Sequence, residues 1–457
     1  MIKTSAIFLF LNYCLGKKVN MSMIVAKIDW RQLYNFASRQ ALLGFCFDGI
    51  ERMTKEFSEE LKQNPMGRDL LMTWMGAAQQ IRRQNMKVNA VAGKLYSKFR
   101  EDGLRCCILK GQGNALMYPN PYSRTPGDID VWVNASREDI TDYAKTHFEI
   151  GDDIRFHHLE TSFDGVPVEL HFFPGIMNNP IYNARLQKWF KRNADLQCSN
   201  VVSLPDGIGE IAIPTTAFNV VYQLTHLYHH FFDEGIGMRQ IIDYFLVVND
   251  FSKNVFLDTD FSNHPVNFSN HPVPLSKEGS TFSPSPSSSG SGDVTALRCS
   301  EPLRSKDGGA SKPSPNCAGW DRLSIEGDNS AGSATAVTSS ASTALVVVQR
   351  ELKYLGLCKF AGAVMYVLHE ALGLSEEKMI APMDEKRGKL LLAEILNGGN
   401  FGKHFTKYGH FTQQGMAKKY FLKIWRNMHF VRYYSAEALS EPIFRTWHFF
   451  WRMKNKE

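Results

Sequence analysis

The 457-residue chain has no cysteine pattern that would hold a zinc ion or build a disulfide framework. Its eight cysteines include no CxxC pair, and no cysteine–histidine spacing matches a zinc site. Scattered thiols of this kind are typical of a reducing compartment. The composition therefore predicts a cytoplasmic protein.

A long, strongly apolar run is also missing. The charge-free stretches long enough to cross a bilayer, residues 211–232 and 329–349, are too polar, so no membrane span is expected. The apolar run at residues 6–14 is followed by Leu-Gly-Lys-Lys-Val-Asn and not by a small-residue cleavage site. We interpret residues 1–23 as a disordered extension or an overlong start, with a secretory signal as the alternative.

Charge of one sign is only modestly in excess. Lys and Arg number 52 against 46 Asp and Glu, which leaves a formal net charge of +6. A protein that binds nucleic acid regardless of sequence usually gathers Lys and Arg on one face or stripe. No such stripe stands out, so a strong nucleic-acid footprint is not expected, although a basic nucleotide pocket is compatible with the total.

The spacing of apolar residues divides the chain into helical and mixed parts. In residues 24–100 they recur three and four positions apart, which predicts an N-terminal helical region. In residues 101–213 short apolar runs alternate with Gly, Pro and Asn clusters and one helical segment, which indicates an α/β or α+β core. Helical patterns return in residues 214–250, expected to pack on the core, and in a C-terminal region, residues 345–457.

Residues 251–344 differ in composition from the rest of the chain. They are rich in Ser, Gly, Pro, Asn and Thr, and they contain a tandem heptapeptide that starts at Phe261 and again at Phe268. Such a segment buries too little apolar surface to offset the entropy of ordering it. We predict a disordered low-complexity insertion that splits one helical region.

Two carboxylates lie two positions apart in Asp128-Ile-Asp130-Val-Trp-Val133. Residues two apart in a strand share a face, so both aspartates project together while the alternating apolar residues enter the core. Adjacent carboxylates repel each other, and placing them together is costly unless a cation neutralises them. A hard divalent ion, Mg²⁺ or Mn²⁺ in its place, fits such oxygen ligands.

A third carboxylate lies on the later segment Val166-Pro-Val-Glu-Leu-His-Phe172, whose polar face carries Glu169 and His171. If this strand lies beside the first, Glu169 completes a cluster able to hold two metal ions roughly 3.5–4 Å apart for phosphoryl transfer. Glu169 could also accept a proton from the attacking hydroxyl. The alternative is a solvated residue on an edge strand.

Upstream, Lys110-Gly111-Gln112 lies where a strand turns into a helix. Glycine permits close backbone approach, and a helix N-terminus presents unpaired N–H groups to phosphate. Lys110 and Arg124 are the nearest cations for triphosphate charge, with ordinary surface charge as the alternative.

Two further pairs lie four residues apart on helices. His226 and His230 have a metal-compatible spacing, but without an HExxH motif the packed helix face is the preferred interpretation. Arg239 and Asp243 are expected to form an ion pair on the helix surface.

Together these motifs resemble those of an uncharacterised bacterial nucleotidyltransferase family within the polymerase-β-like superfamily. The resemblance rests on Leu109-Lys-Gly, Arg124-x-x-Gly-Asp-Ile-Asp and Val168-Glu-Leu-His. It implies an α+β fold, in which helical regions flank a small mixed sheet with a polymerase-β-like core. It implies that Asp128 and Asp130 are metal ligands, that Glu169 is the third carboxylate of the catalytic and metal site, and that Gly111 lies in the phosphate-facing turn. With the turn and the cations described above, the expected nucleotide-binding residues are Lys110, Gly111, Gln112 and Arg124.

The sequence therefore predicts a metal-dependent nucleotidyltransferase. It would move a nucleoside monophosphate from a nucleoside triphosphate to an acceptor with release of pyrophosphate. The acceptor could be a small molecule, a sugar phosphate, a protein or an RNA end. The alternatives are a non-catalytic nucleotide-binding or interaction protein on the same fold, and a metal-dependent glycosyltransferase.

Overall fold

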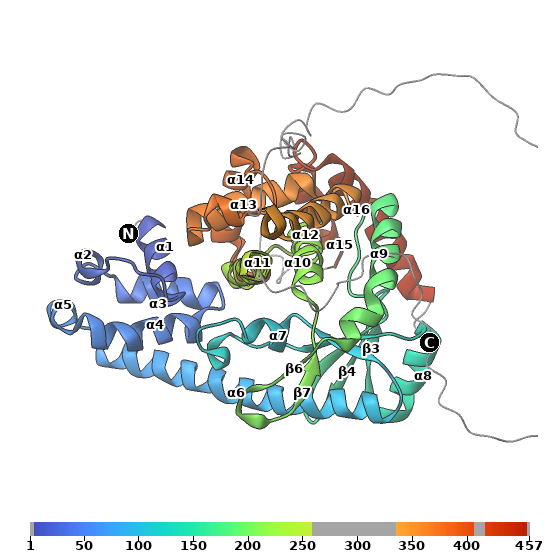
Figure 1. Ribbon diagram of the computed structural model, residues 1–457, viewed down its shortest axis with the longest axis horizontal. Helices are drawn as coiled ribbons and strands as arrows, with labels where there is room; N and C mark the ends of the chain where they lie inside the picture. Colours follow the sequence, from blue (N-terminus) through green and yellow to red (C-terminus); the bar gives the residue numbers. More distant parts are fainter. Residues whose placement is uncertain (1–3, 258–334, 406–415, 455–457) are drawn as a thin grey trace, which may run out of the picture. The chain divides into compact units, whose positions relative to one another are not determined.

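A five-stranded sheet lies among the helices of the protein, and the computed structural model describes residues 4–257, 335–405 and 416–454 (Figure 1). The strands are β1 (Cys106–Leu109), β2 (Ile129–Val133), β3 (Glu149–Ile154), β4 (His158–Phe163) and β5 (Val166–His171). Their order is β1-β2-β5-β4-β3, with β2 and β5 parallel and the other neighbours antiparallel. The predicted α+β class with a small mixed sheet is confirmed.

One face of this sheet forms the hydrophobic core with the long helix α6 (Arg68–Glu101), which runs beneath it in Figure 1. The sheet contributes Ile129, Val131 and Val133, and the helix contributes residues such as Leu95. Helix α8 (Arg137–His147) covers the same core and is capped by Ser136, as its sequence indicates. The alternation of β2 therefore places its aspartates on the opposite face.

That opposite face is covered by α9 (Pro180–Ser199) and α10 (Thr216–Asp233). Trp132 of β2 contacts Phe190 of α9, with 6.0 Å between ring centroids, and stacks on Phe218 of α10 at 5.9 Å. These contacts hold α10 above the polar side of the sheet, where the site lies.

The remaining elements are a second small sheet and the other helices. A second, two-stranded sheet pairs β6 (Val201–Ser203) with β7 (Glu210–Ala212). The N-terminal helices are α1 (Thr4–Cys14), α2 (Ser22–Val25), α3 (Trp30–Arg39), α4 (Leu43–Glu56) and α5 (Ser58–Gln63). The others are α7 (Gly111–Ala115), α11 (Met238–Leu257), α12 (Thr335–Tyr354), α13 (Cys358–Leu372), α14 (Glu385–Gly398), α15 (Met416–Met428) and α16 (Ser435–Lys454), with 3-10 turns η1 (Pro121–Ser123), η2 (Pro205–Gly207), η4 (Glu376–Lys378) and η5 (Asn400–Gly402).

Helix α1 differs from the disordered extension expected for residues 1–23. Its side chains Phe10 and Leu11 are buried, and the Asn12 amide donates to the carbonyl of Ala371 in α13 at 3.1 Å. Contacts with α4 and α13 order this segment. The contact between Asn12 and Ala371 connects residues 359 positions apart, which local composition does not reveal.

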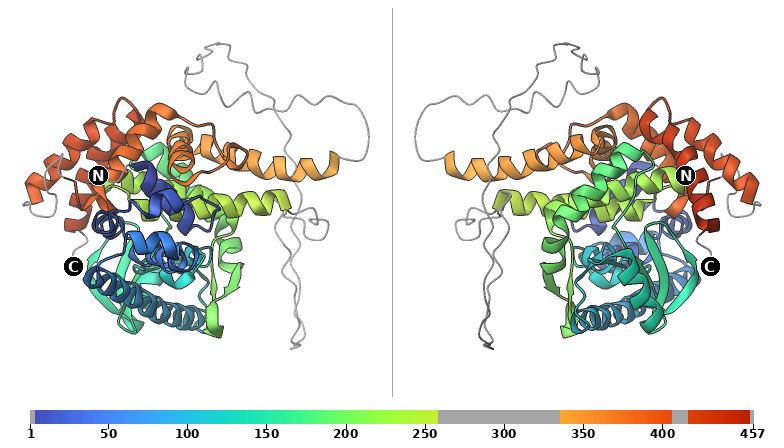
Figure 2. Two further views of the ribbon diagram at one scale, coloured as in Figure 1. Left: turned by 90° about the vertical axis from the view of Figure 1, so that its left-hand side faces the viewer. Right: turned by 90° about the vertical axis from the view of Figure 1, so that its right-hand side faces the viewer.

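The predicted insertion at residues 251–344 lies mostly outside the described residues. Its two ends are helical, because α11 continues to Leu257 and α12 begins at Thr335. Figure 2 shows these two helices side by side. Helix α11, before the insertion, therefore packs against helix α12, after it.

Within the described part of the chain, every helix is either too short or too polar to cross a bilayer.

Candidate active site

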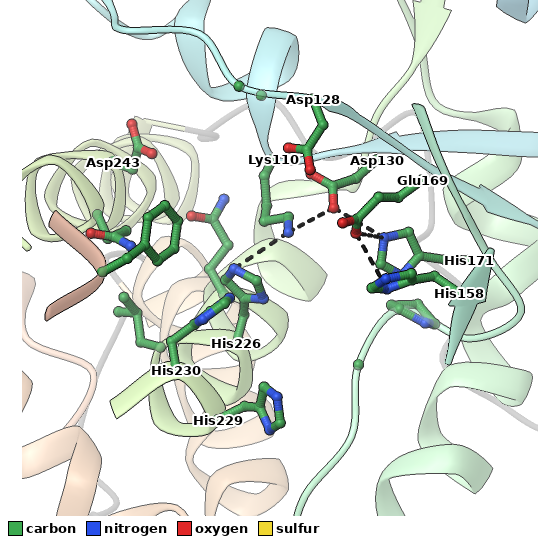
Figure 3. Close-up of a pocket in the computed structure, with 18 of the residues that line it drawn as sticks. Lys110, Asp128, Asp130, His158, Glu169, His171, His226, His229, His230 and Asp243 are labelled. Carbon is green, nitrogen blue, oxygen red and sulfur yellow. Dashed lines mark hydrogen bonds and ion pairs between the residues drawn. The ribbon is translucent and has the colours of Figure 1, made fainter. Parts of the chain in front are cut away.

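Three strands bring acidic and basic side chains together on the face of the sheet opposite α6. Asp130 of β2 lies in register with Leu109 of β1 and with Glu169 of the parallel strand β5. Asp128 immediately precedes β2 and makes a side-chain hydrogen bond with Glu169. The structure therefore brings together the three carboxylates on which the sequence analysis concentrated (Figure 3).

Two basic side chains contact these carboxylates. The Nζ atom of Lys110 lies 2.9 Å from Oδ1 of Asp130 and 3.3 Å from Nε2 of His226 on α10. His171 Nε2 lies 3.0 Å from the same Asp130 oxygen and 3.3 Å from Oε2 of Glu169. Asp130, which is 6% exposed, is thus enclosed by two cationic partners.

The environment separates the pKa values of the three carboxyl groups. Burial, with the nearby charges of Asp130 and Glu169, raises the pKa of Asp128 to about 7. Burial acts in the same direction on Asp130, but Lys110 and His171 outweigh it and hold its pKa well below the usual range. The pKa of Glu169 falls to about 2, mainly through its hydrogen bond with His171, despite burial.

The same contacts shift the pKa of His171 upward. Burial alone would lower its pKa, but its bonds to Asp130 and Glu169 raise the pKa to about 9. Adjacent titratable groups with pKa values driven apart are characteristic of functional sites. At neutral pH the cluster therefore combines ionised carboxylates, a cationic imidazole and one carboxyl group near its midpoint.

The turn after β1 carries an unusual backbone. Lys110 has φ 52° and ψ −121°, and Gly111 follows with φ 26°. A non-glycine residue in this region costs about 1–3 kcal/mol, and such strain clusters at functional sites. The turn directs the Lys110 side chain at Asp130, while α7 behind it has only five residues.

A buried ion pair forms another wall of the site. Arg124 donates from Nε and Nη2 to the two carboxylate oxygens of Asp243 on α11, at 2.9 and 2.8 Å, and Tyr118 donates to the same carboxylate at 2.7 Å. Arg239 instead donates to the carbonyl of Thr125 at 3.2 Å. The ion pair expected between Arg239 and Asp243 is therefore replaced by a pair with Arg124, because both oxygens of Asp243 face that guanidinium.

These groups line a cavity of about 290 Å³. Its walls come from the sheet, from α10 and α11, and from Phe401 of η5. The cavity lies near the small end of the range for ligand pockets, about 300–1,000 Å³. It is large enough for part of a nucleotide next to the carboxylates.

The chain also matches a known protein family. Residues 26–261 match the model of a family described as uncharacterised nucleotidyltransferase. This chain belongs to that family.

Other comparisons add little. The structure of an antigenic nucleotidyltransferase-like protein from Paracoccidioides brasiliensis is similar over 35% of this chain and 75% of its own, with 17% identity and a TM-score of 0.24. At that score the similarity says nothing about the site. No curated protein matches the chain.

In this member of the nucleotidyltransferase family, Lys110, Gly111 and Arg124 line the cavity together with the three carboxylates. Gln112 is oriented differently, since its buried side-chain amide donates to Asn89 of α6 at 3.1 Å. Only its backbone would then be available to a nucleotide.

The histidines of the nucleotidyltransferase cavity were underrated by sequence reasoning. His226 and His230 line it, together with His229, so the packed helix face expected from their spacing also forms a wall of the cavity. Burial, with the charge of nearby His229, lowers the pKa of His230 to about 3, which keeps its ring neutral. A signal was available, because three of the five residues from His226 to His230 are histidines on one helix.

His157 and His158 were missed altogether. His158 begins β4, and its Nδ1 atom lies 3.3 Å from Oε2 of Glu169. The His-His dipeptide, placed two strands from the aspartates in the final sheet, could have been noticed only as a composition feature.

Proposed function

We propose that this protein is a divalent-metal-dependent nucleotidyltransferase that moves a nucleoside monophosphate from a nucleoside triphosphate to an acceptor and releases pyrophosphate. The observation that carries the proposal is the register of Asp130 and Glu169 on adjacent parallel strands, with Asp128 hydrogen-bonded to Glu169. Family membership supports the transferase class.

The carboxylates fit a divalent cation. Asp130, Glu169 and His171 each offer one ligand atom within 4.8 Å of the others. Asp128 is held near pKa 7 by burial and by two neighbouring carboxylates, which is the electrostatic penalty that a cation would relieve. Asp128, Asp130 and Glu169 would hold Mg²⁺ or Mn²⁺, which when bound supplies stabilisation of charge on phosphoryl oxygens.

The side chains that line the cavity would have separate roles in the proposed reaction. Lys110 would bind phosphate oxygens from the turn, and Arg239, which lines the cavity, would contribute a second cation. The raised pKa of Asp128 would fall once a cation lay beside it, so it does not mark Asp128 as the proton acceptor. Glu169 would help to activate the acceptor hydroxyl. Arg124, already paired with Asp243, would shape the wall instead of moving with the substrate.

The test replaces Asp130 by Asn, an isosteric change that removes one charge. We expect Asp130→Asn to abolish Mg²⁺-dependent release of pyrophosphate from labelled nucleoside triphosphates while the thermal unfolding profile keeps its shape. Asp142→Asn, on the exposed face of α8, is the matched control and should keep full turnover. Undiminished turnover in Asp130→Asn would remove this site from the mechanism.

The acceptor is identified by the same reaction in cell extract. Mass spectrometry of extract incubated with enzyme and labelled nucleotides asks which molecule gains a nucleoside monophosphate, without assuming its chemistry. An Asp130→Asn incubation supplies the background.

One observation favours a second candidate, a non-catalytic nucleotide-binding protein. Lys110 and His171 already neutralise Asp130, so the site is partly satisfied without a cation. A thermal-shift series with ATP, GTP, CTP and UTP, each with and without Mg²⁺, separates the two. Binding without pyrophosphate release across a broad acceptor set would favour the second candidate.

A further inference from the structure

A block of metal-ligand side chains lies on one face of β4 and β5, next to the carboxylates. In the antiparallel register, His158 lies opposite His171 and Glu160 lies opposite Glu169. Residues two apart in a strand share a face, so all four side chains project to the same side of the sheet. Two carboxylates directly opposite each other repel, and Arg155 already lies beside one of them, with Nη2 3.1 Å from Oε1 of Glu160.

His157 joins this block from the residue before β4. One ring nitrogen from each of His157, His158 and His171 lies within 4.8 Å of the others. The ring centroids of His157 and His158 are 4.3 Å apart, and those of His158 and His171 are 5.1 Å apart. Three imidazoles therefore converge on one point, and Figure 3 shows His158 and His171 beside Glu169.

The nitrogens of this trio are poorly satisfied. His158 is 3% exposed and His171 is 2% exposed. Within the described residues, Nδ1 of His157, Nε2 of His158 and Nδ1 of His171 make no hydrogen bond, while Nδ1 of His158 contacts Oε2 of Glu169 at 3.3 Å. A buried polar atom without a partner costs about 1–3 kcal/mol, so several in one place call for an unseen ligand.

We infer that His157, His158 and His171, with a carboxylate oxygen of Glu169, form a binding site for a transition-metal ion of the Zn²⁺ class. Imidazole nitrogens favour Zn²⁺ and its transition-metal neighbours, whereas Mg²⁺ takes oxygen ligands. The nearest contact between the histidines and the carboxylate, 3.3 Å from His158 Nδ1 to Glu169 Oε2, is short enough for both to reach one ion. The site shares Glu169 with the proposed catalytic cluster but needs no nucleotide.

The cavity gives an ion access to this site. His157, His158, His171 and Glu169 all line the same 290 Å³ cavity as Lys110. A Zn²⁺ ion here would lie beside the bound triphosphate of the proposed reaction and would contribute charge that Lys110 alone does not supply. This last role rests on the proposed function, whereas the binding of Zn²⁺ itself does not.

The test measures Zn²⁺ binding to the full-length, chelator-stripped protein by competition with a chromophoric chelator. We expect about one tightly bound Zn²⁺ per chain that millimolar Mg²⁺ does not displace. The double variant His157→Gln/His158→Gln should weaken binding at least tenfold. His147→Gln, an exposed histidine on α8, is the matched control and should bind Zn²⁺ like the parent.

A second measurement needs no variant and so does not depend on how well the double variant folds. X-ray absorption of the Zn²⁺-loaded parent protein should show two or three imidazole ligands at about 2.0–2.1 Å. A shell of oxygen ligands only, or unchanged affinity in a folded double variant, would overturn the inference.

The two proposals fail separately. Asp128→Asn should remove Mg²⁺-dependent turnover and should weaken Zn²⁺ binding less than the histidine double variant does, because Asp128 contacts Glu169 but none of the three histidine ligands. Zn²⁺ binding as expected, without pyrophosphate release from any nucleotide, would refute the transferase proposal alone.

Discussion

Arg124 and Asp243, 119 residues apart in the chain, form a buried two-point ion pair with N–O distances of 2.9 and 2.8 Å. Burial and the paired charges oppose each other here: Asp243 raises the pKa of Arg124 and Arg124 lowers the pKa of Asp243, in both cases against the effect of burial. The pair joins the loop before β2 to helix α11. It therefore fixes the wall of the cavity to the helical part of the protein.

Breaking this pair should cost much more than a surface charge would. Asp243→Asn leaves the buried Arg124 guanidinium without its carboxylate, so we expect the free energy of unfolding to fall by about 3–5 kcal/mol. Denaturant unfolding followed by circular dichroism measures it. The double variant Arg124→Leu/Asp243→Leu should lose less than Asp243→Leu alone, and a loss equal to the sum of the two single-variant losses would show that the charges do not interact.

Lys110→Met removes the ammonium group that lies 2.9 Å from Asp130. We expect kcat/KM for the nucleoside triphosphate to fall about 10²-fold, because one fixed cation at a charged transition state is worth about that much. Lys94→Met is the control, since Lys94 is exposed and pairs with Asp164 at the surface. A change smaller than about threefold in Lys110→Met would contradict its role in phosphate binding.

The titration of Glu437, a residue outside the site, should make the free energy of unfolding depend on pH. Burial, with the charge of Glu441, raises its pKa from 4.5 to about 7 although it accepts backbone hydrogen bonds from Asn178 and Asn179. The folded state thus holds a proton that the unfolded chain releases, so this contribution is complete below pH 4.5 and is lost as the pH rises through 7. The loss amounts to about 2–3 kcal/mol.

The measurement compares unfolding free energies between pH 4.5 and 8 in the parent and in Glu437→Gln. The variant should show the flatter profile, because Gln carries no proton to lose. Glu101→Gln, exposed at the end of α6, should keep the slope of the parent. Identical slopes in the parent and Glu437→Gln would show that Glu437 titrates normally.

Two helical glycines should respond oppositely to alanine. A Cβ on Gly44 of α4 would lie 2.5 Å from the backbone oxygen of Ser123, in the loop that carries Arg124, whereas a Cβ on Gly76 of α6 would meet nothing within 4 Å. Gly44→Ala should therefore destabilise by about 1–3 kcal/mol, and Gly76→Ala should stabilise by about 0.5–1 kcal/mol. The measurement compares the thermal unfolding of both variants with that of the parent. A stabilised Gly44→Ala would refute the close approach of Gly44 to the Ser123 backbone.

The sequence by itself determined the local parts of this protein. The alternation around Asp128 and Asp130 is a property of one strand, and so is that around Glu169, because residues two apart in a strand share a face whatever surrounds it. The alternation of short strands and helices likewise indicated an α/β or α+β core. Each of these inferences uses residues within a few positions of one another.

Only the tertiary structure decided how those parts meet. It placed β5 beside β2, so that Glu169 lies in register with Asp130, and it placed His158 opposite His171. It also paired Arg124 with Asp243 and ordered α1 against α13. The physical reason is that strand order and buried ion pairs depend on contacts between distant segments. No local sequence pattern indicates which distant segments will be in contact.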